Sequence, residues 1–481
     1  SRAGDYCSVS SHVSSSEPVM TTQRSLLPNE VKRGMRVSIL EGSFAMLYST
    51  LAGGMFLTGL ALYCGANSFE LALITAAGPL ASLFGFVSGW LVRLCGSRKS
   101  VVLGTAGAGR AVFLVLVPFL LLRDRVSYEL LLGTVVVSSI LMNVAGTTWT
   151  SWMSDLIPQE RRGRFFGLRN AIHGALGVVV AYWAGRGMDI MKAARMEGLG
   201  YALAFGLAAL FGTVSTILLL RQPEPIRCSR PRLGLRQTFF GPLREPEFRR
   251  LTVFLAGWFL TGTLASPFYL PHLLRNLRFS FAAVGVYSMI GGGLGVLFQL
   301  FWGRVIDRFG ARPVTVFAFS LTGVMPFLWV LASPAFRLPI WIDAVLNGIV
   351  WTGGSLGLWN LLLELADQPE HRESYFAIYY VVTGLGAFVA SLLAGVVAHQ
   401  LEVTGFRVEL SGRIFLPYHL VFAVAGFFRF AMLPLLFRVR QSGSKPVSHT
   451  MKALVTVAVW RLNASKEWLL RALLPRERTN S

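Results

Sequence analysis

Long apolar runs alternate with short polar breaks from residue 38 to residue 437, and this alternation dominates the sequence. A helix that crosses a bilayer needs about 20 mostly apolar residues, and in lipid only helices and closed barrels satisfy their backbone polar groups. The runs here are long and continuous, which favours helices. The pattern therefore predicts twelve transmembrane helices, at 38–65, 70–93, 101–122, 128–151, 165–185, 199–220, 250–272, 281–303, 313–332, 340–363, 375–398 and 415–437.

The twelve runs fall into two sets of six, separated by an Arg- and Pro-rich segment that is typical of a linker. The first 30 residues are Ser-rich and lack the apolar segment of a secretory signal peptide, and Met20 is a candidate start. The predicted organisation is a disordered tail (1–35), a six-helix bundle (36–221), a linker (222–249), a second six-helix bundle (250–438) and a tail (439–481).

The composition agrees with an integral membrane protein, since 53% of the residues are hydrophobic and 14% are charged. The net charge of +21 is also typical of nucleic-acid partners, but most of the 45 Lys and Arg residues flank helices on the side of the two termini. By the positive-inside rule this side is the cytoplasm. We therefore expect a plasma-membrane protein, or an inner-membrane protein in a bacterium, with both termini cytoplasmic and no nucleic-acid partner.

One charged loop occurs twice, as GWLVRLCGSRKS at 89–100 and WGRVIDRFGARP at 302–313. Both copies follow the second helix of their half, and four positions match at an offset of 214: Gly89, Arg93, Gly96 and Arg98 match Gly303, Asp307, Gly310 and Arg312. A second match joins Pro158 and Arg161 to Pro369 and Arg372 at an offset of 211. Two matches at nearly one offset indicate a duplicated six-helix unit.

The loop GRVIDRFGAR resembles the signature loop of the major facilitator superfamily, and SDLIPQERRGRFFG resembles that family's segment before the fifth helix. The resemblance covers roughly residues 36–440. It implies an all-α fold of two six-helix bundles, a solute site near the middle of the bilayer, and alternating access by rocking one bundle against the other. It also implies a cytoplasmic gate, whose candidates are Gly89, Arg93, Arg98, Arg161, Arg162, Arg164, Gly303, Asp307, Arg308, Arg312, Glu370 and Glu373.

The first copy departs from the family motif, because Arg93 stands where the family usually has Asp. The family fold brings the loop after the second helix to the eleventh helix, where Glu370 and Glu373 lie, and Asp307 to the fifth helix with its Arg161–Arg164 cluster. We hypothesise that both charge pairs latch the cytoplasmic face and favour an outward-open state. The alternative is that they are ordinary loop charges, since exposed ion pairs contribute only about 0 to 1 kcal/mol. Arg98 and Arg312 are expected to contact lipid phosphates or a facing helix end.

Ionisable residues inside the predicted helices are candidates for function, because their burial in lipid is costly. Arg110 lies near the middle of the third helix and Arg429 lies deep in the twelfth. For each of these two arginines there are two alternatives: it binds an anionic group of the solute, or it holds neighbouring helices together. Glu41 and His173, with Arg110, are the candidates for coupling to a proton or another ion, whereas Asp343 and Glu364 are predicted near the membrane interfaces.

The resemblance implies that the first, fourth, seventh and tenth helices line the solute cavity. Their polar and aromatic residues suit a neutral or amphipathic organic solute. The same residue types also line membrane interfaces or bridge packed helices. The substrate-binding candidates are Tyr48, Asn143, Thr147, Trp149, Trp258, Thr261, Asn347, Trp351 and Asn360.

Other features add little chemistry. Cys7, Cys64, Cys95 and Cys228 are far apart in the sequence, so neither a metal site nor a disulfide framework is indicated. The Gly-rich stretches lie inside apolar runs without a phosphate-binding Lys, so no nucleotide cofactor is expected. In the C-terminal tail apolar residues alternate with basic ones, which predicts an amphipathic helix on the cytoplasmic lipid surface.

The sequence thus predicts a secondary active transporter of a small organic solute, which works as a monomer in a lipid bilayer and is not an enzyme. A transporter-fold sensor or scaffold without net flux is one alternative. A multi-pass membrane enzyme is another, and it would need clustered acids, histidines or metal ligands that the sequence does not offer.

Overall fold

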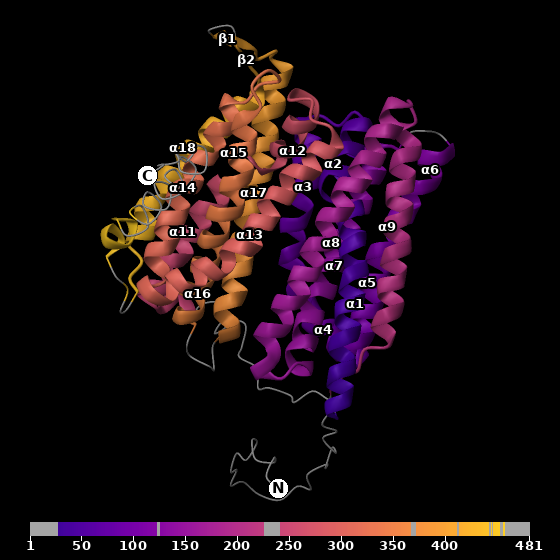
Figure 1. Ribbon diagram of the computed structural model, residues 1–481, viewed down its shortest axis with the longest axis vertical. Helices are drawn as coiled ribbons and strands as arrows, with labels where there is room; N and C mark the ends of the chain where they lie inside the picture. The colour runs from indigo at the N-terminus through magenta and orange to yellow at the C-terminus, as the bar shows by residue number, and fades with distance from the viewer. Residues whose placement is uncertain are drawn as a thin grey trace, which may run out of the picture.

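In the computed structural model the apolar runs form helices that lie roughly side by side (Figure 1). The structure describes residues 27–122, 126–225, 241–366, 372–410, 413–441, 444, 446–452 and 456. Within these residues, eleven helices are long and apolar enough to cross a membrane. The helical segment from Leu338 to Leu365, which carries Asp343 and Asn347 among its apolar residues, completes the predicted set of twelve.

The first half contains six helical spans. The first begins at Pro28, inside the segment predicted as a tail, and it breaks at Gly53 and at Gly54, whose φ of 49° favours glycine. The six spans are formed by α1 (Pro28–Ala52) with α2 (Gly54–Tyr63); α3 (Ser68–Ser82), η1 (Leu83–Phe86) and α4 (Val87–Cys95); α5 (Arg98–Ala111), η2 (Val112–Val115) and α6 (Leu116–Leu122); α7 (Tyr128–Leu156); α8 (Gln159–Ala193); and α9 (Glu197–Leu220).

The second half repeats this arrangement with two irregular spans, the seventh and the tenth. A short turn, η3 (Pro242–Arg244), precedes the seventh span, and a two-stranded antiparallel hairpin, β1 (Val408–Leu410) with β2 (Arg413–Phe415), connects the last two. The spans are formed by α11 (Pro246–Gly262), η4 (Ser266–Phe268), α12 (Tyr269–Pro271) and η5 (His272–Asn276); α13 (Phe281–Phe309); α14 (Ala311–Leu331); α15 (Leu338–Leu346), η6 (Asn347–Trp351) and α16 (Thr352–Leu365); α17 (Arg372–Val403); and α18 (Pro417–Phe437).

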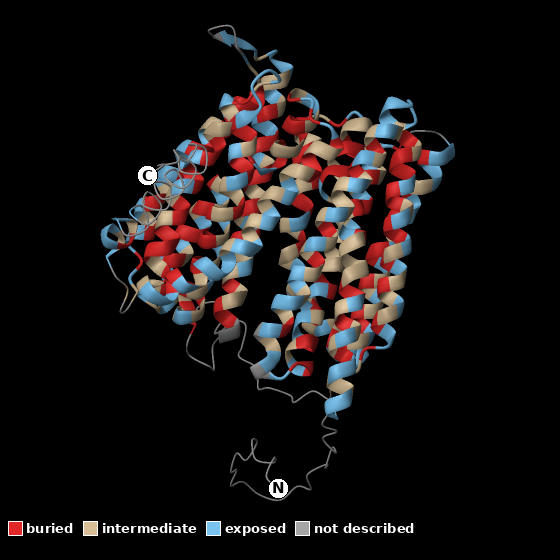
Figure 2. Ribbon diagram, in the orientation of Figure 1, coloured by how far each residue is buried: buried red, intermediate tan, exposed pale blue. Residues whose placement is uncertain are grey.

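Many large apolar residues of both halves are exposed. Exposed residues, pale blue in Figure 2, recur along the helices of both halves. Leu122, Leu300, Phe427 and Trp183 expose between 66% and 84% of their surface. A water-soluble protein rarely exposes apolar residues on this scale. Together with the length of the helices, this surface is that of a multi-pass membrane protein.

The duplicated loop closes its half in the same way in both copies. Gly96 and Gly310 both have positive φ angles, 67° and 97°, which explains why the repeat keeps glycine there. The backbone N–H of Arg98 donates to Glu224, and that of Arg312 donates to Gln441, at 2.6 and 2.7 Å. Each acceptor follows the sixth helix of its half, so the loop is bound within its own half.

We call the end of the molecule where α1 begins and α9 ends the linker side, and the end with β1 and β2 the hairpin side. The two halves approach each other on the hairpin side and diverge toward the linker side (Figure 1). The main contacts pair α3 with α17 and α8 with α13. A hydrophobic cluster with members from both halves, among them Phe56, Phe268 and Phe281, also joins them. The structure therefore represents a conformation that is closed on the hairpin side.

Candidate functional site

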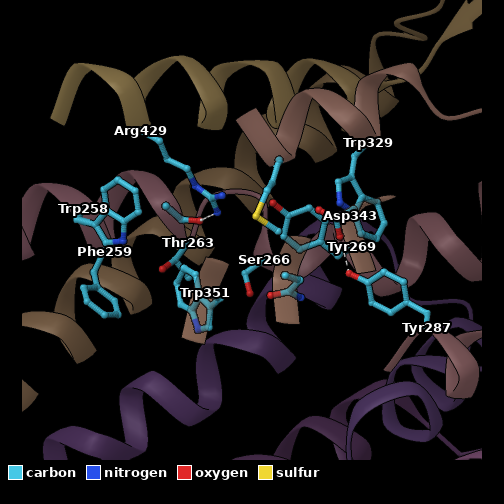
Figure 3. Close-up of a pocket in the computed structure, with 13 residues that line it drawn as sticks. Trp258, Phe259, Thr263, Ser266, Tyr269, Tyr287, Trp329, Asp343, Trp351 and Arg429 are labelled. Carbon is cyan, nitrogen blue, oxygen red and sulfur yellow. Dashed lines mark hydrogen bonds between the residues drawn. The ribbon is translucent and has the colours of Figure 1, made fainter. Parts of the chain in front are cut away.

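A cavity of about 260 Å³ lies inside the second half. Helices from five spans surround it, and nearly half of its lining residues are aromatic (Figure 3). The lining residues are Trp258, Phe259, Gly262, Thr263, Ser266, Tyr269, Tyr287, Met325, Trp329, Asp343, Asn347, Trp351 and Arg429.

The cavity lies where the seventh and tenth spans depart from regular α-helix. The α-helix of the seventh span ends at Gly262, and the chain continues through η4. The tenth span contains the π-helical turn η6, whose first and last residues, Asn347 and Trp351, both line the cavity. A π-turn inserts an extra residue per turn and occurs often at functional sites. Both irregular segments therefore contribute residues to the wall of the cavity.

Asp343 is the acidic group of the cavity, and only 2% of its surface is exposed. The Tyr287 hydroxyl donates to its Oδ2 at 2.6 Å, whereas its Oδ1 has no hydrogen-bond partner among the described residues. Figure 3 shows Asp343 beside Tyr269 and Tyr287. Asp343 lies about one turn after the start of α15 at Leu338 and packs inside the second half, and its place near a membrane interface stays a prediction.

Arg429 is the basic group of the cavity and is also buried. Its Nη1 and Nη2 donate to the carbonyl oxygens of Thr322 and Gly262 at 3.0 and 2.7 Å, and within the described residues its Nε has no partner. These bonds tie the twelfth span to the ninth and seventh. Among the ion pairs of the described residues, none joins Arg429 to Asp343. The cavity wall thus carries two opposite charges that do not neutralise each other directly.

The three predicted coupling candidates meet in a buried cluster of the first half. Glu41 Oε1 lies 3.3 Å from Arg110 Nη2 and accepts from the Ser215 hydroxyl at 2.7 Å, while Arg169 Nη2 lies 4.0 Å from Glu41 Oε2. The His173 ring contacts the Ile39 carbonyl oxygen at 3.2 Å. We call these five side chains, Glu41, Arg110, Arg169, His173 and Ser215, the Glu41 cluster. Two guanidinium groups therefore share one carboxylate there.

Sequence reasoning misses Arg169, although it lies one helical turn before His173 on the same face of α8. Its guanidinium stacks over the ring of Trp149 at 4.5 Å, and Gly42 lies close to both Arg169 and His173. A Cβ at Gly42 would overlap these side chains. The close approach of α1 and α8 is thus what brings Arg169 to Glu41.

The structure divides the nine substrate-binding candidates. Trp258, Asn347 and Trp351 line the cavity of the second half, and Trp258 stacks on Phe319 with ring centroids 4.4 Å apart. Of the others, Tyr48 is a core residue bonded to Ser138 and Thr261 donates to its own helix. The remaining four lie outside this cavity: Asn143, Thr147, Trp149 and Asn360.

The predicted gate residues are not joined across the two halves in this conformation. Arg93, Arg161, Arg164 and Asp307 are exposed, and among the described residues no ion pair links them. Glu370 lies outside the described residues, as does the side chain of Glu373. A Cβ added at Gly89 or Gly303 would meet no other atom within 4 Å, so no close packing requires glycine there. The cytoplasmic latch stays a prediction for the opposite conformation.

The other gate candidates contact their own half. Arg98 is buried and pairs with Asp155 at 2.6 Å, so it contacts neither lipid nor the opposite half. Arg312 donates to the Phe437 carbonyl oxygen at the end of α18, and Arg162 donates to Ile157 at the end of α7. Arg308 lies over the ring of Phe309. Arg312 and Arg162 thus stabilise helix ends, where partial negative charge favours cations.

No group of three or more His, Cys, Asp or Glu side chains that could hold a metal ion occurs in the described part of the chain. The predicted amphipathic helix of the tail lies mostly outside the described residues.

Comparisons with known proteins identify the fold. The sequence matches the family model of the Major Facilitator Superfamily over residues 39–368 and 297–475. No curated protein matches the sequence significantly. Among solved structures, the chain is similar to a mutant form of the nucleoside transporter NupG, with 10% identity, a TM-score of 0.66 and coverage of 86% of this chain and 100% of that chain.

Two further solved structures share the arrangement. A D-xylose-proton symporter is 13% identical, with a TM-score of 0.64 and coverage of 86% of this chain and 98% of that one. A bacterial homologue of the human lysosomal transporter Spinster, in an inward-facing and unoccupied conformation, is 15% identical, with a TM-score of 0.58 and coverage of 87% and 100%. The family model spans most of the chain and the described helices repeat the fold of these transporters, so the chain belongs to the major facilitator superfamily.

Proposed function

We propose that this membrane transporter moves a small organic solute by alternating access as a secondary active transporter, and that the cavity of the second half is part of its solute site. The observation that carries the proposal is the cavity itself, a space of about 260 Å³ with aromatic walls and a few polar groups. Small-molecule sites typically have this composition. The linker side is then the cytoplasmic side, and the structure corresponds to a cytoplasm-open state.

The lining favours a solute with an aromatic or otherwise flat apolar body and at least one hydrogen-bond donor. Trp258, Trp351 and Tyr269 offer ring faces to such a body. Asp343 Oδ1 and Asn347 offer polar partners. Because Asp343 has no cation within ion-pair distance among the described residues, a cationic solute group or a proton would relieve the cost of burying its charge.

The Glu41 cluster supports a different role from the predicted one. Glu41 already faces two guanidinium groups, so a proton on its carboxylate would leave both of them without their partner. We therefore favour Asp343 over Glu41, His173 and Arg110 as the group that links solute movement to a proton. One of the similar solved structures is itself that of a proton symporter.

The experiment is a ligand-dependent thermal shift screen on the purified protein, followed by flux of each hit in proteoliposomes. We expect the shift to disappear in Asp343→Asn and Trp351→Ala and to persist in Glu409→Gln, whose exposed carboxylate lies on the hairpin strand β1. Hits that bind both cavity variants normally would place the solute site elsewhere. Hits that bind without any flux would favour the sensor or scaffold alternative.

A proton gradient imposed on the same proteoliposomes tests the coupling. We expect uptake to follow the gradient, to fall when an uncoupler is added, and to become insensitive to both in Asp343→Asn. Uptake that ignores the gradient in the unmodified protein would exclude proton coupling and leave the solute proposal intact.

A further inference from the structure

A carboxylate of the first half caps a helix of the second half on the hairpin side. Asp189, near the end of α8, accepts from the backbone N–H groups of Phe281 and Ala282 at 2.8 and 3.0 Å. These are the first two residues of α13, and Ser280 accepts from the third, Ala283. Asp189 therefore satisfies N–H groups that a helix start leaves without partners, and its charge faces the positive end of the helix dipole.

An equivalent contact runs in the other direction, from a carboxylate of the second half to a helix start of the first. Glu402, in the last turn of α17, accepts from the Ser68 hydroxyl at 2.7 Å and from the Ser68 backbone N–H at 3.4 Å. Ser68 is the first residue of α3, and its hydroxyl also lies 2.9 Å from that of Tyr418. Asp189 and Glu402 are 213 positions apart, as are Ser68 and Phe281. The two contacts are thus copies of one another, at nearly the offset of the duplicated loop.

Close helix packing accompanies both carboxylates. A Cβ at Gly185 would lie 2.8 Å from the backbone of Phe281, and one at Gly285 would lie 3.1 Å from the backbone of Tyr182. In the other copy, a Cβ at Gly395 would lie 2.5 Å from that of Ala72. The helices approach so closely that the interface is also sensitive to a single methyl group.

We infer that Asp189 and Glu402 are a pair of latches that hold the hairpin side closed, and that both must release before the molecule opens on that side. The inference rests on the proposed alternating access, because only a second conformation gives the latches something to release. In the closed state each carboxylate accepts charge-assisted hydrogen bonds from the other half. When the hairpin side opens, these bonds are replaced by bonds to water. Asp189 is the stronger latch, since it accepts two short backbone bonds whereas Glu402 accepts one short hydroxyl bond.

The test measures how often the hairpin side opens. Phe56 is 1% exposed and stacks on Phe281 across the interface, with ring centroids 6.0 Å apart. In a background with the four natural cysteines replaced by serine, Phe56→Cys reports opening through its rate of labelling by a membrane-impermeant maleimide, added to the hairpin side of sealed vesicles. We expect Asp189→Asn to raise this rate about twofold to fivefold, which is the factor that a charge at a helix N-terminus typically contributes. Glu402→Gln should raise it less, and the double variant should raise it most.

Glu197→Gln is the matched control, because Glu197 lines the same hairpin-side cavity of about 800 Å³ as Asp189 but, within the described part of the chain, accepts no bond from the other half. Gly185→Ala is a second route to the same result, since its methyl group pushes the helices apart without changing any charge. If Asp189→Asn does not fold, Glu402→Gln and Gly185→Ala carry the test.

Labelling rates that stay equal in all latch variants would overturn the inference, as would an equal increase in Glu197→Gln. A lower unfolding temperature without faster labelling would also overturn the inference, because the two carboxylates would then act only as helix caps. The readout needs no solute, so faster labelling without flux of any hit would contradict the proposed transport and leave the latches standing.

Discussion

The two halves contain an arginine at equivalent junctions and surround it in different ways. Arg110 lies where the first, third and sixth spans meet and pairs with Glu41 on the first. Arg429 lies where the seventh, ninth and twelfth spans meet and donates to backbone carbonyl oxygens there. The first half fills its junction with an ionic network in which two arginines share one carboxylate, whereas the second leaves a cavity. Under the proposed function, one duplicated architecture divides its tasks, with one half for rigidity and the other for the solute.

The largest effect is expected from removing the carboxylate of the first half. Glu41→Ala leaves the buried Arg110 and the partly buried Arg169 without their shared partner, and breaking a buried ion pair in this way costs about 3 to 5 kcal/mol. We expect a large fall of the unfolding temperature in a thermal ramp of the purified protein, with Glu409→Gln as the exposed control. An unchanged midpoint would mean that the cluster contributes little to the rigidity of this half.

A smaller effect is expected at the corresponding arginine of the second half. Arg429→Gln removes two hydrogen bonds to backbone carbonyl oxygens but breaks no ion pair of the described residues, so its cost should be about 1 to 3 kcal/mol. The same thermal ramp compares it with Arg110→Gln. A cost above that of Arg110→Gln would reverse the proposed division between the halves.

Asp343→Asn should change stability by less than about 1 kcal/mol, because it removes a buried charge while its amide oxygen still accepts from Tyr287. Binding of a solute identified by thermal shift should nevertheless be lost. Isothermal titration with that solute separates the two effects. A variant that unfolds more readily yet binds normally would identify Asp343 as a structural residue.

The smallest difference is expected at the ends of the sixth helices, where the halves agree. Lys99 donates to the Leu220 carbonyl oxygen and Arg312 to that of Phe437, each at the last residue of its helix. Lys99→Met and Arg312→Met should each cost about 0.3 to 1 kcal/mol, and high salt should reduce both costs. Thermal ramps at two salt concentrations measure this, and a large difference between the variants would show that the repeat is not equivalent here.

The sequence predicts the fold well because its strongest signals are long apolar runs and a charged loop that recurs at one offset. Glycine at 96 and 310 is explained by the same repeat, since both turns need a positive φ. The site is harder to predict. Sequence reasoning does not assign Asp343 to a cavity, because its distance from the end of an apolar run does not reveal how the tenth span packs, and nothing in the run indicates the π-turn at Asn347.

Arg169 and the two latches are within reach of sequence reasoning. Arg169 and His173 share a helical face, and Asp189 and Glu402 keep the spacing of the repeat. Their partners are backbone groups and side chains on distant helices, however, and only the packing shows them. The gate on the linker side remains a prediction, because its charges do not meet in this conformation.

The glycines of the hairpin side also make the halves complementary to each other and not to themselves. Gly285 of the second half faces Tyr182 of the first, while Gly395 of the second faces Ala72 of the first, so the second half supplies the glycine at these two matched positions. If two copies of the first half paired in this way, Tyr182 of one would face Ala72 of the other, with no glycine at the contact. If two copies of the second half paired, Gly395 would face Gly285 and a gap would remain. At these positions each half therefore fits the other better than it would fit a copy of itself, which is the geometry of a heterodimer on one chain.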